Sequence, residues 1–126
     1  MSNPKAKFFR CPHCGNLMFV VNGSGVVPVC CGEPMMELKP NTNGAGEKHT
    51  PVVDQDGQKV TVTVSEVLHP MQEDHWIEWV YLETDKGGYY RTFKAGEKPE
   101  AVFEIQPDEQ PMDAYAYCNL HGLWAI

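Results

Sequence analysis

The chain has 126 residues, 42% of them hydrophobic, which is enough to bury a core in one medium domain or in a small domain beside a larger one. No apolar segment follows the polar first residues or reaches membrane-spanning length, so we expect a cytoplasmic protein with reduced thiols and no membrane partner. The net charge of −7 is uneven, because residues 1–40 carry +2 and residues 41–126 carry −9. This acidic body argues against a nucleic-acid partner.

Residues 1–38 are predicted to form a small domain held together by its cysteines. Short strands are expected at residues 8–10, 17–21 and 26–29, with a hairpin turn at the glycine-rich residues 22–25. Such a segment buries too little apolar surface to be stable without a metal. A polar, glycine-rich linker at residues 40–46 then predicts a second domain over residues 39–126.

The second domain is predicted to be entirely β. Residues 59–65 alternate strictly and place Val60, Val62 and Val64 on one face. The other expected strands are residues 77–82, 89–94, 101–105 and 114–117, and the expected turns are residues 54–57 and 86–88. Short strands separated by turns favour an antiparallel sandwich, and no segment has a convincing helical period.

Four of the five cysteines form the first candidate metal site: Cys11, Cys14, Cys30 and Cys31. Two cysteines two residues apart can bind one metal from a single turn, and the second pair completes a four-sulfur set for zinc or iron. Gly15 and Asn16 allow backbone amides to point at the sulfurs, and His13 is expected to be a solvated turn residue. Spacing alone favours structural zinc over a single-iron redox centre, with a nucleic-acid zinc ribbon as a weaker third alternative.

A second candidate site combines the lone late cysteine with four histidines: His49, His69, His75, Cys118 and His121. Pro70 starts a turn that can direct two of these histidines at one point, and the amides of Leu120 and His121 are expected to donate to the Cys118 sulfur. Structural zinc seldom has more than four ligands, whereas five nitrogen and sulfur donors suit ferrous iron and leave one octahedral position for a substrate. The main rival is a nucleophile pair of Cys118 with His121 as its base, which leaves the other histidines unexplained.

These motifs resemble, over essentially the whole chain, the desulfoferrodoxin family of two-iron superoxide reductases. The four cysteines are similar to its desulforedoxin-like amino-terminal domain. Glu47-Lys48-His49, His69-Pro70, His75 and Cys118-Asn-Leu-His121 are similar to its neelaredoxin-like catalytic domain. The resemblance implies a mainly β chain, with a small rubredoxin/desulforedoxin-like domain followed by an immunoglobulin-like antiparallel sandwich.

The same resemblance implies a homodimer with iron in both sites, a function in the detoxification of superoxide to hydrogen peroxide under oxidative stress, and electron transport from rubredoxin or a similar donor. It makes the four histidines equatorial ligands and Cys118 the axial ligand of the catalytic iron. Lys48 is then expected to attract superoxide and orient water, and Glu47 to occupy the sixth position after oxidation, although both could simply belong to a solvated charged loop. The alternatives are a non-catalytic two-iron electron carrier and a zinc-stapled β-sandwich that binds a partner.

Overall fold

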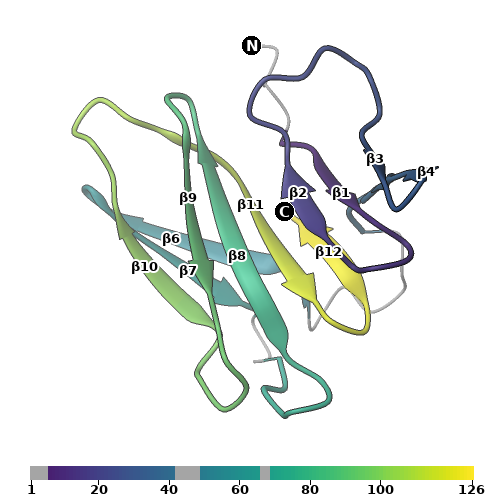
Figure 1. Cartoon of the computed structure of the whole chain (residues 1–126). Helices are drawn as coiled ribbons and strands as arrows, with labels where there is room; N and C mark the ends of the chain where they lie inside the picture. The colour runs from purple at the N-terminus through teal and green to yellow at the C-terminus, as the bar shows by residue number, and fades with distance from the viewer. Residues whose placement is uncertain (1–5, 42–48, 66–68) are drawn as a thin grey trace. The chain divides into compact units, whose positions relative to one another are not determined.

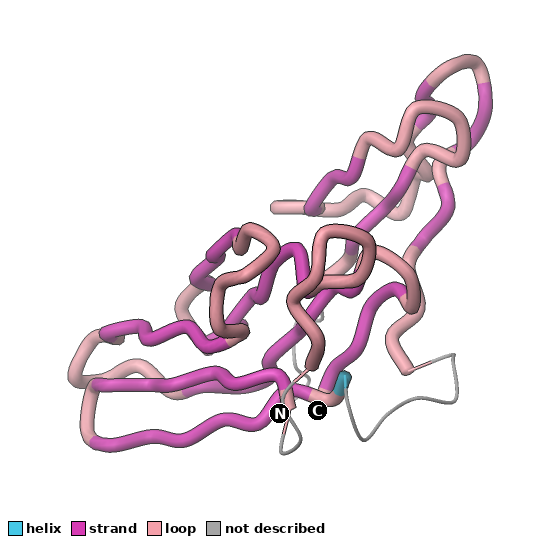
Figure 2. Tube along the Cα trace, turned by 90° about the horizontal axis from the view of Figure 1, so that it is seen from below, coloured by secondary structure: helices cyan, strands magenta, loops and turns pink. Residues whose placement is uncertain are grey.

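The computed structural model describes residues 6–41, 49–65 and 69–126. These residues form twelve strands in four antiparallel sheets (Figure 1). The chain divides into a first unit, Met1–Lys39, and a second unit, Pro40–Ile126. Strands and the loops between them make up nearly all of the described chain (Figure 2), and none of its helical residues belongs to a segment long and apolar enough to cross a membrane.

The first unit contains two small sheets. Strand β1 (Phe8–Arg10) pairs with β2 (Leu17–Phe19) and with β5 (Met36–Glu37). Strand β3 (Val29–Cys30) pairs with β4 (Glu33–Pro34). Its buried core is small: Phe9, Cys11 and Met35 form one cluster that includes a cysteine sulfur, and Phe8 is also buried. A core of this size needs a further crosslink, as the sequence predicted.

The hairpin predicted at residues 22–25 is wrong. Strands β2 and β3, on either side of it, belong to different sheets: β2 returns to β1 and β3 pairs forward with β4. Only Val29 of the strand predicted at residues 26–29 is extended in a sheet. The valines of this segment gave it the appearance of a strand, yet Val21 and Val26 are 89% and 79% exposed. Without a core to cover them, their β propensity was not enough to define a pairing.

The second unit is a sandwich of two antiparallel sheets. One sheet has the order β10-β7-β6, with β6 at Pro51–Asp56, β7 at Lys59–Val64 and β10 at Glu100–Glu104. The other has the order β12-β11-β8-β9, with β8 at Ile77–Thr84, β9 at Gly88–Thr92, β11 at Pro111–Cys118 and β12 at Gly122–Ala125. Three strands facing four is the immunoglobulin-like arrangement, so the predicted fold class is confirmed.

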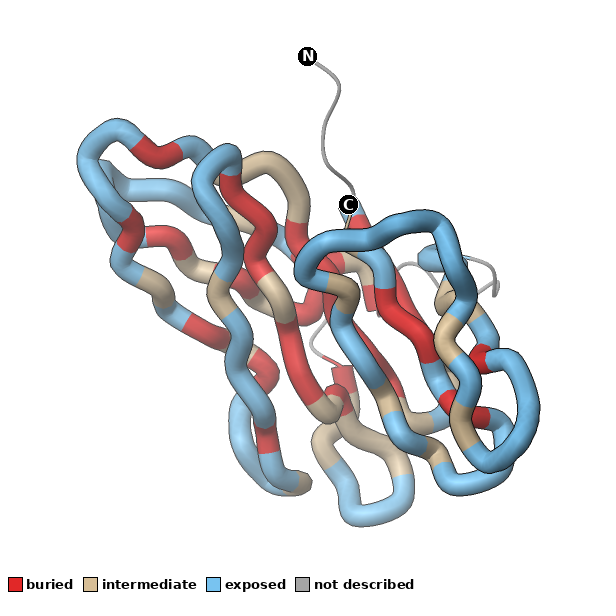
Figure 3. The backbone as a smooth tube through the Cα atoms, turned by 45° about the horizontal axis from the view of Figure 1, so that its top comes forward, coloured by how far each residue is buried: buried red, intermediate tan, exposed pale blue. Residues whose placement is uncertain are grey.

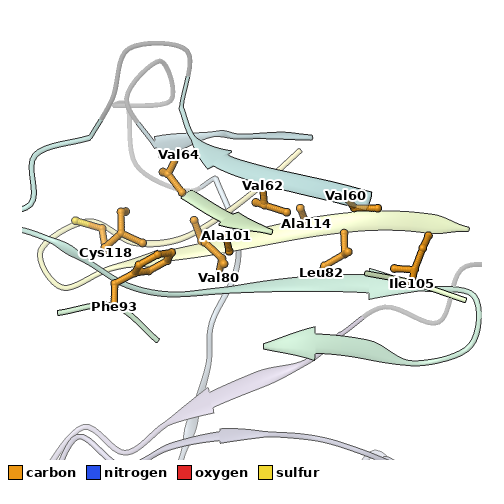
Figure 4. Close-up of a cluster of buried hydrophobic side chains, with 12 residues drawn as sticks. Val60, Val62, Val64, Val80, Leu82, Phe93, Ala101, Ile105, Ala114 and Cys118 are labelled. Carbon is orange, nitrogen blue, oxygen red and sulfur yellow. The ribbon is translucent and has the colours of Figure 1, made fainter. Parts of the chain in front are cut away.

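The core of the second unit lies between its two sheets (Figure 4). Val60, Val62 and Val64 on β7 are completely buried, and they pack in one cluster with Val80 and Leu82 of β8. Strand β11 adds a row of small buried side chains that ends at a cysteine: Ala114, Ala116 and Cys118. Burial alternates along β7, as the period of two predicted, whereas β8 and β11 are buried over most of their length (Figure 3).

Two strands of the sandwich were not predicted from the sequence. Residues expected as a turn at 54–57 belong mostly to β6, which pairs with β7 from Pro51 opposite Val64 to Asp56 opposite Lys59. The turn itself lies at Gly57, whose φ of 63° suits glycine. Strand β6 is an edge strand with exposed carboxylates, which makes its sequence resemble a loop and also protects the edge from further pairing. Strand β12 follows the last histidine and was missed because it has only four residues.

The two faces of the three-stranded sheet give a direct test of this core. We expect Val62→Ala to lower the free energy of unfolding by about 2 kcal/mol, because it removes two buried methyl groups and leaves a cavity. Val102→Ala is the matched control, since Val102 is 54% exposed on the neighbouring strand and Val62 is fully buried. The control should change stability by less than about 0.5 kcal/mol. Equal losses in chemical denaturation would contradict this assignment of faces.

Candidate metal centres

The four cysteines of the first unit converge on one point. Their sulfurs lie within 4.8 Å of one another, with 3.7 Å between Cys14 and Cys30 and 3.9 Å between Cys30 and Cys31. All four thiols are free, and these separations are far beyond the roughly 2.05 Å of a disulfide. Sulfurs about 2.3 Å from a central metal form a tetrahedron with edges of about 3.8 Å. The spacing therefore fits a four-thiolate metal centre.

Backbone conformation explains how two adjacent cysteines reach the same centre. Cys31 has a φ of 55° and Gly32 a φ of 77°, so the chain turns through two left-handed residues directly after Cys30. A left-handed backbone conformation is unusual for residues other than glycine, asparagine and aspartate. In the first pair, Gly15 has a φ of 77° and its amide donates to the Cys11 carbonyl at 3.1 Å, which closes the turn.

Full ionisation of these thiols requires a cation among them. The amide of Cys14 donates to the Cys11 sulfur at 3.5 Å and, with the amide of His13, lowers the pKa of Cys11 to about 6. Contact with the Cys11 and Cys14 sulfurs raises the pKa of Cys30 to about 12, and the pKa of Cys31 is also raised. Once one thiolate forms, its neighbours cannot ionise without a positive charge, and a bound metal supplies it. The amides involved lie inside the Cys-x-x-Cys turn, while Gly15 contributes its backbone conformation.

His13 lies outside this sulfur cluster. Its Nε2 atom is 3.0 Å from a carboxylate oxygen of Glu33, and both side chains are more than half exposed. The prediction that His13 is a solvated turn residue is consistent with this contact.

In the second unit, four imidazoles form a square. Neighbouring ring centroids are 4.5 Å apart for His49 and His69, 4.6 Å for His69 and His75, 5.1 Å for His75 and His121, and 4.8 Å for His121 and His49. The diagonal between His49 and His75 is 6.3 Å, and neighbouring rings are inclined by 66° to 82°. Tetrahedral zinc does not select such an array, whereas four neighbouring imidazoles suit a metal of higher coordination number.

The nitrogens face the centre of this square. The Nε2 atoms of His49 and His69 are 2.9 Å apart, the separation of two nitrogens about 2.05 Å from one metal at a right angle. The Nδ1 atom of His69 donates to the carbonyl of Pro70 at 2.6 Å, which leaves its Nε2 atom unprotonated. Burial, above all, lowers the pKa of His69 to about 4. His69 is therefore a neutral imidazole with its lone pair aimed at the site.

Cys118 reaches the same site from the core. The register of β11 against β8 shifts between Tyr117 and Cys118, a bulge that changes the direction of the strand where it meets the site. The sulfur is completely buried and lies 3.7 Å from Nδ1 of His121. Burial raises the pKa of Cys118, while the amides of Leu120 and His121 lower it. The direction of both effects agrees with the predicted amide hydrogen bonds to this sulfur, which stay a prediction.

The loops that carry the histidines are fixed by contacts that the sequence did not reveal. Gln72 and His75 exchange backbone hydrogen bonds of 2.9 and 3.1 Å, which closes the predicted turn after Pro70. Trp124 stacks on His49 with centroids 5.0 Å apart, and its Nε1 atom donates to the carbonyl of His121 at 3.2 Å. The tryptophan of β12 therefore holds two corners of the square. Its place three residues after His121 was the only sequence signal.

All five predicted donors of this site are brought together, with their donor atoms within 4.8 Å of one another. Because His121 faces His49 and His75 as well as Cys118, the nucleophile-pair alternative describes only part of one cluster. The donor set fits iron: four imidazoles and one thiolate would leave one position of an octahedral shell for a small ligand. Glu47 and Lys48 lie outside the described residues.

Comparison with known proteins finds relatives that match both units of the chain. The sequence profile of the Desulfoferrodoxin family matches residues 41–126, and that of the desulfoferrodoxin N-terminal domain matches residues 4–38. The desulfoferrodoxin of Nitratidesulfovibrio vulgaris is 46% identical over 94% of this chain and 93% of its own length.

Solved structures agree with this match. The superoxide reductase of Treponema pallidum has a TM-score of 0.83 and 34% identity over 97% of both chains. The one-iron superoxide reductase of Giardia intestinalis covers 64% of this chain and 95% of its own, with a TM-score of 0.54 and 28% identity.

Fold and donor sets together define a non-haem metalloprotein with two centres. The chain belongs to the desulfoferrodoxin family, whose two iron centres match its four-cysteine and its four-histidine, one-cysteine sites.

The buried histidines should make the metal-free protein sensitive to acid. The pKa of His69 is about 4 in the folded chain against 6.5 for an unperturbed histidine, so the unfolded state binds more protons between these values. Stability of the metal-free protein should therefore fall as the pH is lowered from about 6.5 to about 4. His69→Gln should reduce this dependence in denaturation curves, and His13→Gln, which removes an exposed histidine, is the control. The same pH dependence in wild type and His69→Gln would contradict the prediction.

Proposed function

We propose that this chain is a superoxide reductase that reduces superoxide to hydrogen peroxide at the four-histidine, one-cysteine iron of its second unit. The observation that carries the proposal is the square of imidazoles joined by one buried cysteine sulfur. The family match supports it, as do structural neighbours that are superoxide reductases.

The charge of the donor set suits an anionic substrate. Neutral imidazoles such as His69 contribute no charge, so the donors supply a single negative charge, that of the Cys118 thiolate. A divalent cation among them keeps a net positive charge, although the sequence from residue 41 onward carries −9. When bound, iron supplies the one electron that, with two protons, converts superoxide to hydrogen peroxide.

The chain's own residues hold and tune this site. The Cys118 thiolate donates electron density to the metal, and the amides of Leu120 and His121 moderate that donation by hydrogen bonding to the sulfur. Burial of His49, His69 and Cys118 keeps bulk water away from one side of the centre. Lys48, directly before a ligand, attracts the superoxide anion and orients water for proton delivery, and Glu47 assists exchange at the sixth position.

Each of the two domains has its own function, which depends on the metal site that it holds. Residues 1–38 form the domain that holds the first iron, which relays or stores electrons, and residues 39–126 form the catalytic domain. The one-iron superoxide reductase of Giardia covers 64% of this chain, which supports a reaction that does not require the first centre.

The working form of the protein is a cytoplasmic homodimer that receives electrons from rubredoxin or a similar small carrier. Five free cysteines support a reducing compartment. Exposed valines on the first unit, Val21, Val26 and Val29 among them, support burial of that surface against a second copy. The acidic second unit supports the exclusion of nucleic acid as a partner.

Two matched cysteine variants test the function and its location. Wild-type protein should contain about two irons per chain and consume superoxide without evolving oxygen. Cys14→Ser should lose the first centre and keep the superoxide reaction, whereas Cys118→Ser should keep the first centre and lose the reaction. Metal analysis, visible spectra and the rate of superoxide loss measure these outcomes.

Each alternative function predicts a different result. Two irons with no superoxide consumption would indicate an electron carrier, and colourless protein containing only zinc would indicate a zinc-stapled binding module. Oxygen evolution would indicate dismutation. Loss of the reaction in Cys14→Ser alone would place catalysis at the first centre.

Lys48 can be tested through the salt dependence of the reaction. Lys48→Ile should slow the second-order reaction with superoxide and make its rate less sensitive to ionic strength, because a positive charge beside the site is lost. Lys59→Ile removes the same charge from the start of the six-residue strand β7, about 17 Å from the end that leads to His69. An effect of equal size in both variants would remove Lys48 from the mechanism.

A further inference from the structure

Asn119, between the two donors of the Cys118-x-x-His121 loop, joins this loop to the loop that carries His75. Its Oδ1 atom accepts a hydrogen bond from the backbone amide of Trp76 at 3.0 Å. Its Nδ2 atom donates to the backbone carbonyl of Asp74 at 3.0 Å. One side chain therefore holds both flanking residues of a histidine ligand, across 45 positions of sequence.

These hydrogen bonds use both ends of the Asn119 amide. Its own backbone amide also donates to the carbonyl of Trp76 at 3.2 Å, so main chain and side chain grip the same segment. The Oδ1 atom lies 4.0 Å from the Cys118 sulfur. The clamp is thus in contact with the thiolate on one side and with the backbone around His75 on the other.

We infer that Asn119 is a positioning residue that fixes the Cys118 sulfur relative to the His75 imidazole, and thereby sets how strongly the thiolate donates to the iron. This inference rests on the proposed function, because it assigns both groups to one metal. Half-exposed loops leave ligand directions poorly fixed unless further hydrogen bonds hold them. Neither Asp74 nor Trp76 is a donor to the metal site, so the two hydrogen bonds of the Asn119 side chain act on the centre through the backbone that they hold.

A second asparagine provides a matched control in the same unit. Asn41 also uses both ends of its amide on one backbone segment: its Nδ2 atom donates to the carbonyl of Ala125 at 3.1 Å, and the amide of Ala125 donates to its Oδ1 atom at 2.9 Å. It spans 84 positions of sequence but holds a residue of β12 that is not a donor to the centre. Loss of either asparagine removes the same number and type of hydrogen bonds.

The test uses iron-loaded, full-length Asn119→Ala, Asn119→Asp and Asn41→Ala. In Asn119→Ala, hydrogen exchange of the backbone around Trp76 and around Leu120 should accelerate about tenfold to hundredfold, the effect of losing two hydrogen bonds. The thiolate-to-iron absorption of the oxidised catalytic centre should shift at unchanged iron content. Asn41→Ala should accelerate exchange near Ala125 and leave that absorption in place.

The Asn119→Asp variant distinguishes the effects of the two hydrogen bonds. It keeps an acceptor for the Trp76 amide, so exchange there should stay close to wild type, but it loses the donor to the Asp74 carbonyl. The absorption should still shift, because a carboxylate replaces a neutral oxygen near the sulfur.

Each outcome has one meaning. Wild-type exchange and absorption in Asn119→Ala would overturn the inference, as would an equal shift of the absorption in Asn41→Ala. If wild-type protein itself shows no thiolate-to-iron absorption or no superoxide consumption, the proposed function fails instead.

Discussion

The arrangement of the second unit depends on the sulfur atom of Cys118, which is part of both the hydrophobic core and the metal site. Cys118 closes the row of small residues that β11 contributes to the sandwich core, and it is also a donor of the metal site. Packing of the core therefore fixes one ligand before any metal binds. The bulge beside it turns the strand into the loop that delivers His121. A change in how the two sheets pack would move the thiolate and the site with it.

The remaining donors come from loops, and each loop is held by specific contacts. Trp124 stacks on His49 and donates a hydrogen bond to the His121 carbonyl, the Pro70 carbonyl accepts a hydrogen bond from His69, and Asn119 binds the backbone on both sides of His75. A rigid sandwich with ligands on its connecting segments is a common way to build a metal site, because the strands set the distances and the loops set the directions.

Electrostatics separates the two sites. The neighbouring sulfurs raise the pKa of Cys30 to about 12 and also raise the pKa of Cys31, so the first site needs a cation to ionise fully and then keeps a net negative charge. The second site has mostly neutral donors and keeps a net positive charge around a divalent cation. A negative centre suits the storage or relay of electrons, and a positive one suits the binding of a small anion. This difference is the physical basis for assigning the reaction to the second unit.

The sequence by itself determined the donors and the class of fold. Cys11, Cys14, Cys30 and Cys31 could be grouped because cysteine chemistry is local and their spacing is unusual. The sandwich followed from strands such as β7, whose alternating valines need two faces of different polarity.

Only the tertiary structure decided which strands pair and how the donors are arranged. The sequence suggested a hairpin turn at residues 22–25 and a turn at residues 54–57, and both were wrong because pairing depends on which residues find a core to cover. The square of imidazoles, the stacking of Trp124 and the clamp of Asn119 join residues that are far apart in the chain or spaced without a recognisable period. Their positions follow from long-range packing, so no local pattern could have shown them.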